Sequence, residues 1–383
     1  MLDLDQLLRF AVEQGASDVH VKVGARPRLR IDGQLREAPF DTVEPADTER
    51  IAAAVMSPER AQELRAAAES DCTYTIAGLG RFRVSAFRQR GWIGLVLRRV
   101  LPGVPGFDAL SLPPAVRVLA EQGHGLVLVA GLAGSGKTAT LAAMVDHVNS
   151  DRDCHVVTIE DPIEVLHADK RSIVDQREVG RDTRSARSAL EHVLRQDPDV
   201  VMVSRLRDAD EVWAALQAAE AGHLVLAGLS TVNAIDTIDR LVEMFEPHRQ
   251  RQVRLSMASA LRGIVAQRLV PRAGGRGRVP AVEVLVVNVR VAERIADARP
   301  DELAQEMADG DLYGMQTFDQ SLTQLYRDGL VTRAAALEHA DVPGELRFVL
   351  DQADFERGQT GATGAPGLAV APLAPPPPVT QPA

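Results

Sequence analysis

The chain contains only two cysteines, Cys72 and Cys154, among its 383 residues. Two cysteines cannot build a disulfide framework or a four-cysteine zinc site, so we expect a protein of the reducing cytoplasm. The sequence has no run of 18 consecutive apolar residues, which argues against a membrane-spanning helix. Its first ten residues are acidic rather than basic, so we expect no secretory signal peptide.

Lysine is also scarce, because only Lys22, Lys137 and Lys170 occur among 43 basic residues. The formal net charge of −10 argues against broad nucleic-acid binding. The length predicts two or three domains, and a hydrophobic content of 45% is ordinary for a globular protein. Because lysine is so rare in this arginine-rich sequence, its presence at position 137 makes the segment around that residue a candidate functional site.

Lys137 lies in GLAGSGKTAT, residues 131–140, which has the spacing of a phosphate-binding Walker A loop. An apolar run at 126–130 precedes it and a helical pattern at 141–148 follows. Glycines let such a loop curl so that its backbone N–H groups surround phosphate oxygens. We expect Lys137 to reach the β- and γ-phosphates and Thr138 to offer its hydroxyl to Mg²⁺; the alternative is a glycine-rich turn without a ligand. The predicted nucleotide-binding residues of the loop are Gly131, Gly134, Ser135, Gly136, Lys137, Thr138 and Ala139.

Residues 1–100 predict a small α+β domain. Helical patterns occur at 2–14 and 48–68, and a hairpin is expected at 28–35 around Asp32 and Gly33. Alternating strand patterns occur at 19–23, 74–76, 80–88 and 94–100. The proline- and glycine-rich stretch 101–114 predicts a linker.

Residues 115–345 predict an α/β domain with a parallel sheet, because short apolar strands alternate with helices. The predicted strands are 126–130, 155–159, 200–204, 223–229 and 279–287; the predicted helices are 138–149, 184–196, 208–219, 234–244 and 249–267. A helical C-terminal part follows, with Phe318, Leu322, Leu325 and Tyr326 on one face. We assign residues 346–383 to a disordered, proline-rich tail, either passive or a polyproline recognition peptide.

Three acidic residues follow the predicted strand 155–159 directly. Glu160, Asp161 and Glu164 should therefore lie at the carboxyl edge of the parallel sheet, where ligands bind. The alternative is that these carboxylates cap a helix or pair with arginines.

Nine segments, taken in order, resemble the type IV pilus twitching-motility ATPases of the PilT/PilU type, within the secretion-ATPase superfamily. They are GASDVH (15–20), RFRVSAF (81–87), the Walker A loop, TIEDPIE (158–164), DQREVGRDT (175–183), RQDPDVVMV (195–203), AAEAGHLVLAGLST (218–231), TIDR (237–240) and GMQT (314–317). The resemblance spans about residues 1–345. It implies a PAS-like N-terminal domain, a RecA-like ATPase domain with a helical C-terminal part, and a ring of six subunits that binds ATP and drives pilus retraction. Pilus-assembly members usually carry a tetracysteine metal site, so this chain fits the retraction branch better.

The resemblance also implies roles for single residues. Glu160, Asp161 and Glu164 would face the Mg²⁺ and the γ-phosphate, with Asp161 as a possible metal ligand. Arg81 and Arg83 would reach the nucleotide like arginine fingers, unless they form surface ion pairs. His223 matches the first histidine of the family's His box, unless it is only a structural residue.

Two family positions are altered here. Arg205 stands where the family has its Walker B glutamate, and Ser230 stands where the second histidine of the His box is expected. Arginine cannot accept a proton, and loss of a general base costs on the order of 10²–10⁴ in rate. Arg205 would either add positive charge near the γ-phosphate or point away into an ion pair.

We therefore expect an ATP-binding subunit of a hexameric retraction motor that hydrolyses ATP weakly and acts as an accessory or regulatory paralogue. The alternatives are an active motor that uses Glu164 or Glu160 as base, and an interaction scaffold without nucleotide. The expected partners are a related retraction ATPase or further copies of the chain, together with an inner-membrane pilus platform protein. We expect no nucleic acid, only peripheral membrane contact, and a location on the cytoplasmic side of the inner membrane.

Overall fold

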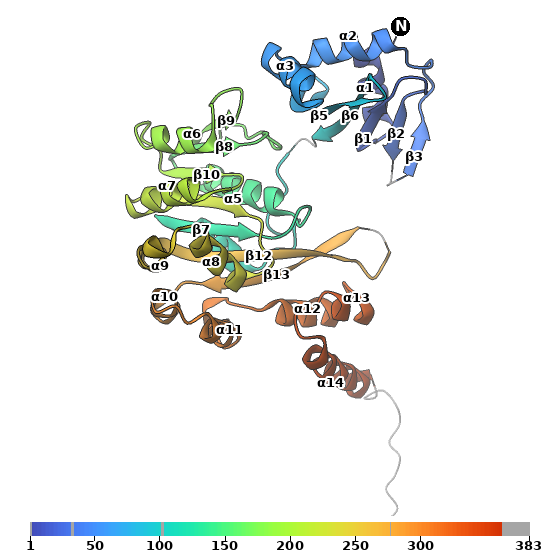
Figure 1. Cartoon of the computed structure of the whole chain (residues 1–383). Coiled ribbons are helices and arrows are strands. Elements are labelled where there is room, and N and C mark those ends of the chain that lie inside the picture. The colour runs from blue at the N-terminus through green and yellow to red at the C-terminus, as the bar shows by residue number, and fades with distance from the viewer. Residues whose placement is uncertain (1, 32–33, 101–102, 276, 362–383) are drawn as a thin grey trace, which may run out of the picture.

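The structure is a computed structural model that describes residues 2–31, 34–100, 103–275 and 277–361. Figure 1 shows an N-terminal sheet with its helices, then a second sheet layered between helices, and last a helical C-terminal part. The two sheets come from separate stretches of the sequence, because β1–β6 end at Val100 and β7 begins at Gly125.

The N-terminal sheet has the strand order β3-β2-β1-β6-β5-β4, with antiparallel neighbours throughout. Its core includes Leu7, Leu8, Ile51, Phe82 and Leu97. The elements are α1 (Leu4–Glu13), β1 (Asp18–Val21), β2 (Arg28–Ile31), β3 (Gln34–Glu37), α2 (Pro45–Val55), α3 (Pro58–Ala67), β4 (Glu69–Ile76), β5 (Gly80–Gln89) and β6 (Trp92–Val100). These match the α+β pattern that the sequence predicts, although Asp32 and Gly33, the expected hairpin turn, lie outside the described residues.

The second sheet has the order β13-β12-β7-β11-β10-β8-β9, and its neighbours are parallel except for the β12–β13 pair. Its strands are β7 (Gly125–Ala130), β8 (His155–Glu160), β9 (Ile173–Glu178), β10 (Val200–Val203), β11 (Leu224–Leu229), β12 (Leu261–Pro271) and β13 (Arg278–Val286). The predicted parallel sheet is thus present, and the carboxyl ends of β7, β8, β10 and β11 meet at one edge.

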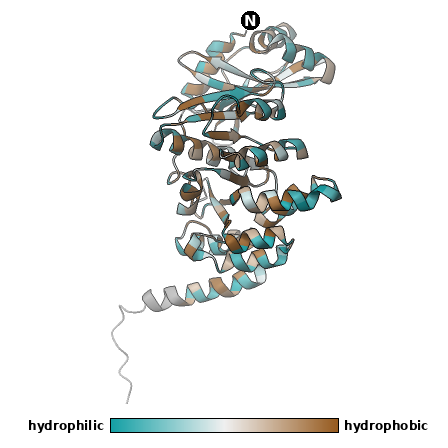
Figure 2. Ribbon diagram, turned by 90° about the vertical axis from the view of Figure 1, so that its left-hand side faces the viewer, coloured by the Kyte–Doolittle hydropathy of each residue, from teal (hydrophilic) through white to brown (hydrophobic). Residues whose placement is uncertain are grey.

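Helices cover both faces of this sheet. On one face, α4 (Pro114–Ala120) and α5 (Lys137–Asp151) pack on residues such as Val127 and Val129. The opposite face is covered by α6 (Ala186–Val193), α7 (Ala209–Glu220), α8 (Ala234–Glu243) and α9 (Pro247–Ala260). Strands buried on both faces read as continuous apolar runs, and Figure 2 shows apolar residues concentrated on the strands and the inner helix faces.

One predicted helix is wrong in its second half. The sequence pattern predicts a helix over 249–267, but α9 ends at Ala260 and β12 begins at Leu261. The segment pairs with β7 on one side and β13 on the other, and a Cβ on Gly263 would lie 2.6 Å from the Leu119 side chain. Tertiary pairing therefore overrides a helix pattern that continues through this apolar stretch.

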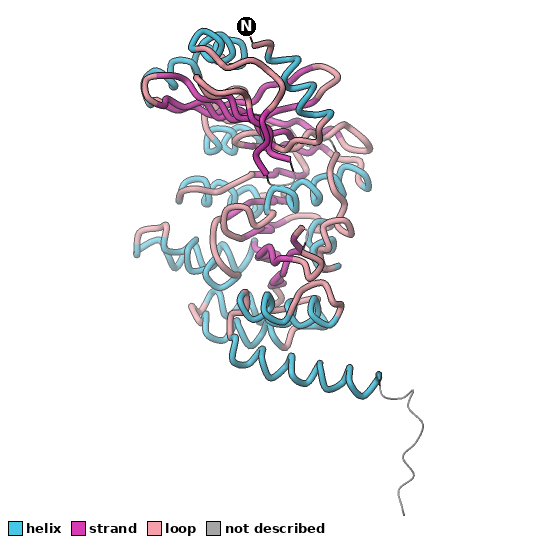
Figure 3. Tube along the Cα trace, turned by 90° about the vertical axis from the view of Figure 1, so that its right-hand side faces the viewer, coloured by secondary structure: helices cyan, strands magenta, loops and turns pink. Residues whose placement is uncertain are grey.

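The prediction of a disordered tail is also wrong for the first residues of that segment. The C-terminal part consists of α10 (Val289–Ala296), α11 (Pro300–Ala308), a short 3₁₀ turn (Asp311–Tyr313), α12 (Phe318–Arg327), α13 (Arg333–Glu338) and α14 (Pro343–Gly361). Leu346, Leu350 and Ala353 fall at helical spacing and are buried, so this part of α14 packs on the fold, and the predicted disordered tail does not begin at residue 346. Figure 3 shows α14 as the last helix of the chain; residues 362–383 lie outside the described part.

Among the described residues, no helix combines the length and the apolar character that crossing a membrane requires.

Glu283, the single acid of β13, is buried and predicts an effect of pH on stability. Burial of Glu283 raises the pKa of its carboxyl to about 7, although the backbone N–H of Ala234 donates a hydrogen bond that favours the ionised form. The folded protein holds this proton more tightly than the unfolded chain does. The contribution of Glu283 to stability is therefore present in full below about pH 4.5, the unfolded value, and is lost as the pH rises to about 7.

In Glu283→Gln no proton is taken up at this position. We therefore expect the wild type to lose roughly 2 to 3 kcal/mol of unfolding free energy relative to the variant between pH 5 and pH 8. Urea unfolding of both proteins at the two pH values measures this difference. A difference that stays constant with pH contradicts the assignment.

Candidate nucleotide-binding site

The predicted phosphate loop joins β7 to α5. Gly131, Gly134 and Gly136 all have positive φ angles, of 150°, 77° and 99°. A Cβ on Gly131 would lie 2.3 Å from Ser135 Oγ and 2.8 Å from the carbonyl oxygen of Gln267. Only glycine therefore fits at position 131, and the loop takes the tight curl that a phosphate cradle needs.

Lys137, the first residue of α5, folds back over this loop. Its Nζ donates hydrogen bonds to the carbonyl oxygens of Gly131 at 2.6 Å and Leu132 at 2.9 Å. Burial lowers the pKa of Lys137, the nearby Arg205 lowers it further, and Glu164 opposes both. The ammonium is thus held at the mouth of the loop, within range of both the Arg205 cation and the Glu164 carboxylate.

The loop has the chemistry that a chain of phosphates requires. Ser135 Oγ is buried and has no hydrogen-bond partner within the described part of the chain, so a donor is left for a ligand. Every helix leaves the N–H groups of its first turn without partners inside the helix, and these carry the positive end of the helix dipole. Thr138 stands in that first turn of α5 and is only partly buried. The residues present therefore fit a nucleotide with Mg²⁺ at the Thr138 hydroxyl.

The three predicted acids all lie at the carboxyl edge of the second sheet, but their surroundings differ. Glu160 is buried and accepts hydrogen bonds from Thr158 Oγ1 at 2.7 Å and Gln176 Nε2 at 2.9 Å. Burial raises the pKa of Glu160 despite these bonds. Glu160 is therefore enclosed by its own chain and has little room for a water molecule.

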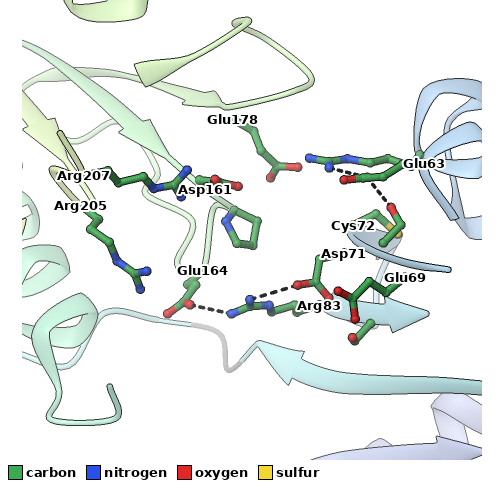
Figure 4. A pocket seen from close by; sticks show the side chains of 14 residues that line it. Glu63, Glu69, Asp71, Cys72, Arg83, Asp161, Glu164, Glu178, Arg205 and Arg207 are labelled. Carbon is green, nitrogen blue, oxygen red and sulfur yellow. Dashed lines mark hydrogen bonds and ion pairs between the residues drawn. The ribbon is translucent and has the colours of Figure 1, made fainter. Parts of the chain in front are cut away.

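Glu164 and Asp161 instead border an open cleft between the two sheets. Glu164 accepts a hydrogen bond from Arg83 Nη1 at 3.2 Å, and Asp161 Oδ2 accepts one from Arg207 Nη2 at 2.5 Å. The cleft has a volume of about 490 Å³. Figure 4 shows the side chains of both sheets meeting across it.

Arg205 extends into this cleft from the loop after β10. Figure 4 shows its guanidinium directed toward Glu164. It forms no hydrogen bond or ion pair with any residue that the structure describes, although its charge acts on Lys137. The structure therefore does not show the alternative, in which Arg205 turns away into an ion pair. Arg207, two residues further along the chain, instead forms an ion pair with Asp161.

Ser230 and His223, the two positions that correspond to the family's His box, lie at opposite edges of the sheet. Ser230 directly follows β11, and the backbone N–H of Gly131 donates to the carbonyl of Leu229 at 3.3 Å, so Ser230 borders the phosphate loop. His223 precedes β11, where its Nδ1 lies 3.0 Å from the carbonyl oxygen of Ala218. A six-residue strand spans about 20 Å, so the structure does not bring His223 together with the phosphate loop of the same chain.

Arg81, for which contact with nucleotide stays a prediction, links the two sheets within this chain. It stands on β5 and forms a buried ion pair with Glu178 on β9, and it also donates to Thr73 Oγ1 at 2.9 Å. Glu178 further accepts the backbone N–H of Ile163 at 3.2 Å, in the loop that carries the predicted acids. Within this chain Arg81 therefore fixes the acidic loop against the N-terminal sheet.

Three residues that link the two parts of the fold were not identified from the sequence: Arg60, Thr73 and Glu178. The Nη2 atom of Arg60 lies 3.5 Å from the carbonyl oxygen of Val179. For Glu178 a signal did exist, because it lies inside DQREVGRDT, one of the segments that carry the resemblance. Thr73 and Arg60 lie outside every such segment, and only the approach of the two sheets reveals them.

Removing one partner of the buried Arg81–Glu178 pair should destabilise the protein more than removing both. Arg81→Leu leaves the Glu178 carboxylate buried without its cation, which should cost about 3–5 kcal/mol of unfolding free energy. Arg81→Leu combined with Glu178→Leu should lose less than Arg81→Leu alone, because both buried charges are removed. The control is Arg83→Leu, whose half-exposed pair with Glu164 is worth at most about 1 kcal/mol. Urea unfolding measures all three; an Arg81→Leu protein as stable as the control contradicts the analysis.

Comparison with known proteins agrees with this arrangement. The model of the type II/IV secretion system protein family matches residues 2–328. The type IV pilus ATPase PilU of Pseudomonas aeruginosa is 38% identical over 351 residues, which cover 91% of each chain. The type IV pilus retraction ATPase PilT of the same organism is 36% identical over 342 residues, 89% of this chain and 99% of that protein.

A crystal structure of the pilus retraction motor PilT with bound ADP superposes with a TM-score of 0.84 and 42% identity, covering 91% of this chain and 99% of the other. The ATPase DotB of Legionella pneumophila follows with a TM-score of 0.71 and 25% identity, over 87% and 94% of the two chains. These matches confirm the resemblance and the mixed α/β fold class that the sequence motifs predict. The chain therefore belongs to the type II/IV secretion system protein family and is homologous to its PilT and PilU pilus retraction ATPases.

Proposed function

We propose that this chain is a nucleotide-binding subunit of a hexameric pilus retraction motor and that it hydrolyses ATP only weakly. The observation that carries this proposal is Arg205, which faces Glu164, acts on Lys137 where an acid is expected, and has no ion-pair partner among the described residues. Phosphate binding and water activation depend on different residues of the site.

Phosphate binding is supported by an intact loop. ATP would lie with its β- and γ-phosphates against Lys137 and the N–H groups of residues 131–139, and Mg²⁺ would be held by the Thr138 hydroxyl. When bound, the metal offsets phosphate charge. Arg205 adds a further cation to this edge, which favours a triphosphate over a diphosphate. PilT was crystallised with bound ADP, which supports nucleotide binding by a chain of the same fold.

Water activation is poorly supported. Arginine holds its proton throughout the physiological pH range, so Arg205 is no base. The two carboxylates that could replace it are both engaged, because Glu164 pairs with Arg83 and Glu160 is buried against Thr158 and Gln176. An active motor with either acid as base would have to break these contacts first.

The assembly is proposed from the relatives, of which two are named as type IV pilus ATPases and the crystal structure as a pilus retraction motor. A ring of six would contain copies of this chain or a related, active retraction ATPase, and would act on an inner-membrane platform protein from the cytoplasmic side. A subunit that binds ATP without turning it over would serve such a ring as an accessory or regulatory member.

The binding half of the proposal is tested at lysine. Lys137→Ala should weaken binding of a fluorescent ATP analogue at least 100-fold, since the buried ammonium that contacts phosphate is lost. Lys170→Ala is the matched control, because Lys170 is exposed and pairs with Asp146, so it should leave the affinity unchanged. A wild-type protein that binds no nucleotide would favour an interaction scaffold and contradict the proposal.

The hydrolysis half is tested at position 205. Arg205→Glu should raise the ATP turnover of the purified protein at least tenfold, toward the 10²–10⁴ that a general base typically supplies. Arg205→Ala should gain less, because it removes the cation without providing an acid. Phosphate release assays measure all three proteins. Substantial wild-type turnover that Glu164→Gln abolishes would show an active motor and refute weak hydrolysis.

A further inference from the structure

The carboxyl group of Glu283 lies between the starts of two helices that belong to different parts of the fold. The backbone N–H of Ala234, the first residue of α8, donates to Glu283 Oε1 at 2.7 Å. The backbone N–H of Phe318, the first residue of α12, also acts to lower the pKa of this carboxyl. Glu283 is only 3% exposed, so its bond to Ala234 is made away from water. A single buried acid of β13 thus holds the N-terminus of α8 and faces the N-terminus of α12.

The first of these helices begins next to the phosphate loop. Glu283 on β13 pairs with Ala266 on β12, which in turn pairs with Ala130, the residue before the loop. The carbonyl of Leu229 accepts a hydrogen bond from the Gly131 N–H, and only residues 230–233 separate Leu229 from Ala234.

This short connection is held rigidly. Thr231 Oγ1 lies 2.6 Å from Thr237 Oγ1, and the backbone N–H of Val232 donates to Asp236 Oδ2 at 2.9 Å. A displacement at Ser230 would therefore move the start of α8 as one piece, together with the N–H that Glu283 accepts.

The second helix begins the C-terminal part of the fold. The backbones of Val284 and Gln316 exchange hydrogen bonds at 2.9 and 3.1 Å, and the Val282 N–H donates to Ser321 Oγ at 3.0 Å. The start of α12 is thus fastened to β13 on both sides of Glu283.

The contacts continue beyond α12. The Arg268 guanidinium lies 3.8 Å from the centre of the Phe318 ring and donates to Asp341 at 2.5 Å. The N–H of Asp341 in turn donates to Asp319 Oδ1 at 2.8 Å, just before α14 begins. A shift at the start of α12 therefore reaches the last helix through direct contacts.

We infer that Glu283 is a positioning residue that couples occupancy of the phosphate loop to the C-terminal helical part, α12 to α14. The coupling rests on the proposed function only in requiring that nucleotide binds. Its physical basis is that the start of α8 is bonded to the buried Glu283 side chain, while the start of α12 is bonded to β13 on both sides of Glu283, so a shift of α8 strains the strand that holds α12. Nothing in this role requires hydrolysis, which suits a subunit that holds ATP.

Hydrogen–deuterium exchange tests the coupling. In the full-length wild type, a slowly hydrolysed ATP analogue with Mg²⁺ should change deuterium uptake at residues 230–240 and also at residues 316–327. In Glu283→Ala the change at 230–240 should persist, with affinity for the analogue within threefold of wild type, while the change at 316–327 should disappear. Glu283→Gln, which keeps one acceptor oxygen, should reduce it at least twofold.

The matched control is Glu338→Gln, the same change at an exposed acid of α13, which should respond like the wild type. If Glu283→Ala does not fold, Glu283→Gln decides. The inference is overturned if a folded Glu283 variant binds the analogue and keeps the full change at 316–327, or if wild type binds it and changes only at 230–240. A wild type that binds no analogue refutes the proposed function, and the coupling with it.

Discussion

The proximity of two cationic side chains, Lys137 and Arg205, at the carboxyl edge of the second sheet is the constraint on which this site depends. Lys137 reaches this edge from α5, and Arg205 reaches it from the loop after β10 without a partner among the described residues. Two neighbouring cations repel each other, and an anion between them relieves that repulsion. The edge is therefore built to hold phosphate, while the same charge leaves no group free to take a proton from water.

The acids of the site are held by the N-terminal sheet as much as by their own. Arg83 pairs with Glu164, and the buried Arg81–Glu178 pair fixes the loop on which Asp161 and Glu164 stand. Any movement of the N-terminal sheet would thus change the environment of Glu164 directly. In a ring, such contacts would let neighbouring subunits influence whether this carboxylate is free.

Much of the molecule is predictable from its sequence, for reasons that differ between elements. The strands β7, β8, β10 and β11 are buried on both faces, so they appear as apolar runs, and the phosphate loop depends on glycines whose spacing is set by local geometry. The strand β12 and the helix α14 are misassigned because their structure depends on distant partners.

The same limit applies to the site. Arg205 and Ser230 stand out as departures from a motif, but the pairing of Arg81 with Glu178 and the enclosure of Glu160 depend on how two sheets meet. His223 shows the converse, because motif membership places it in the site, whereas the direction of β11 puts it at the other edge. Motifs therefore identify the residues of such a site better than they identify its contacts.

The central claim is that the site holds a triphosphate and cleaves it only weakly. The most direct measurement follows the chemical identity of bound nucleotide: the purified protein is loaded with ATP labelled at the γ-phosphate and Mg²⁺, freed of excess nucleotide, and sampled over hours. Weak hydrolysis predicts that most of the label is still bound as ATP after an hour. Steady release of labelled phosphate, with ADP accumulating on the protein within minutes, would contradict it.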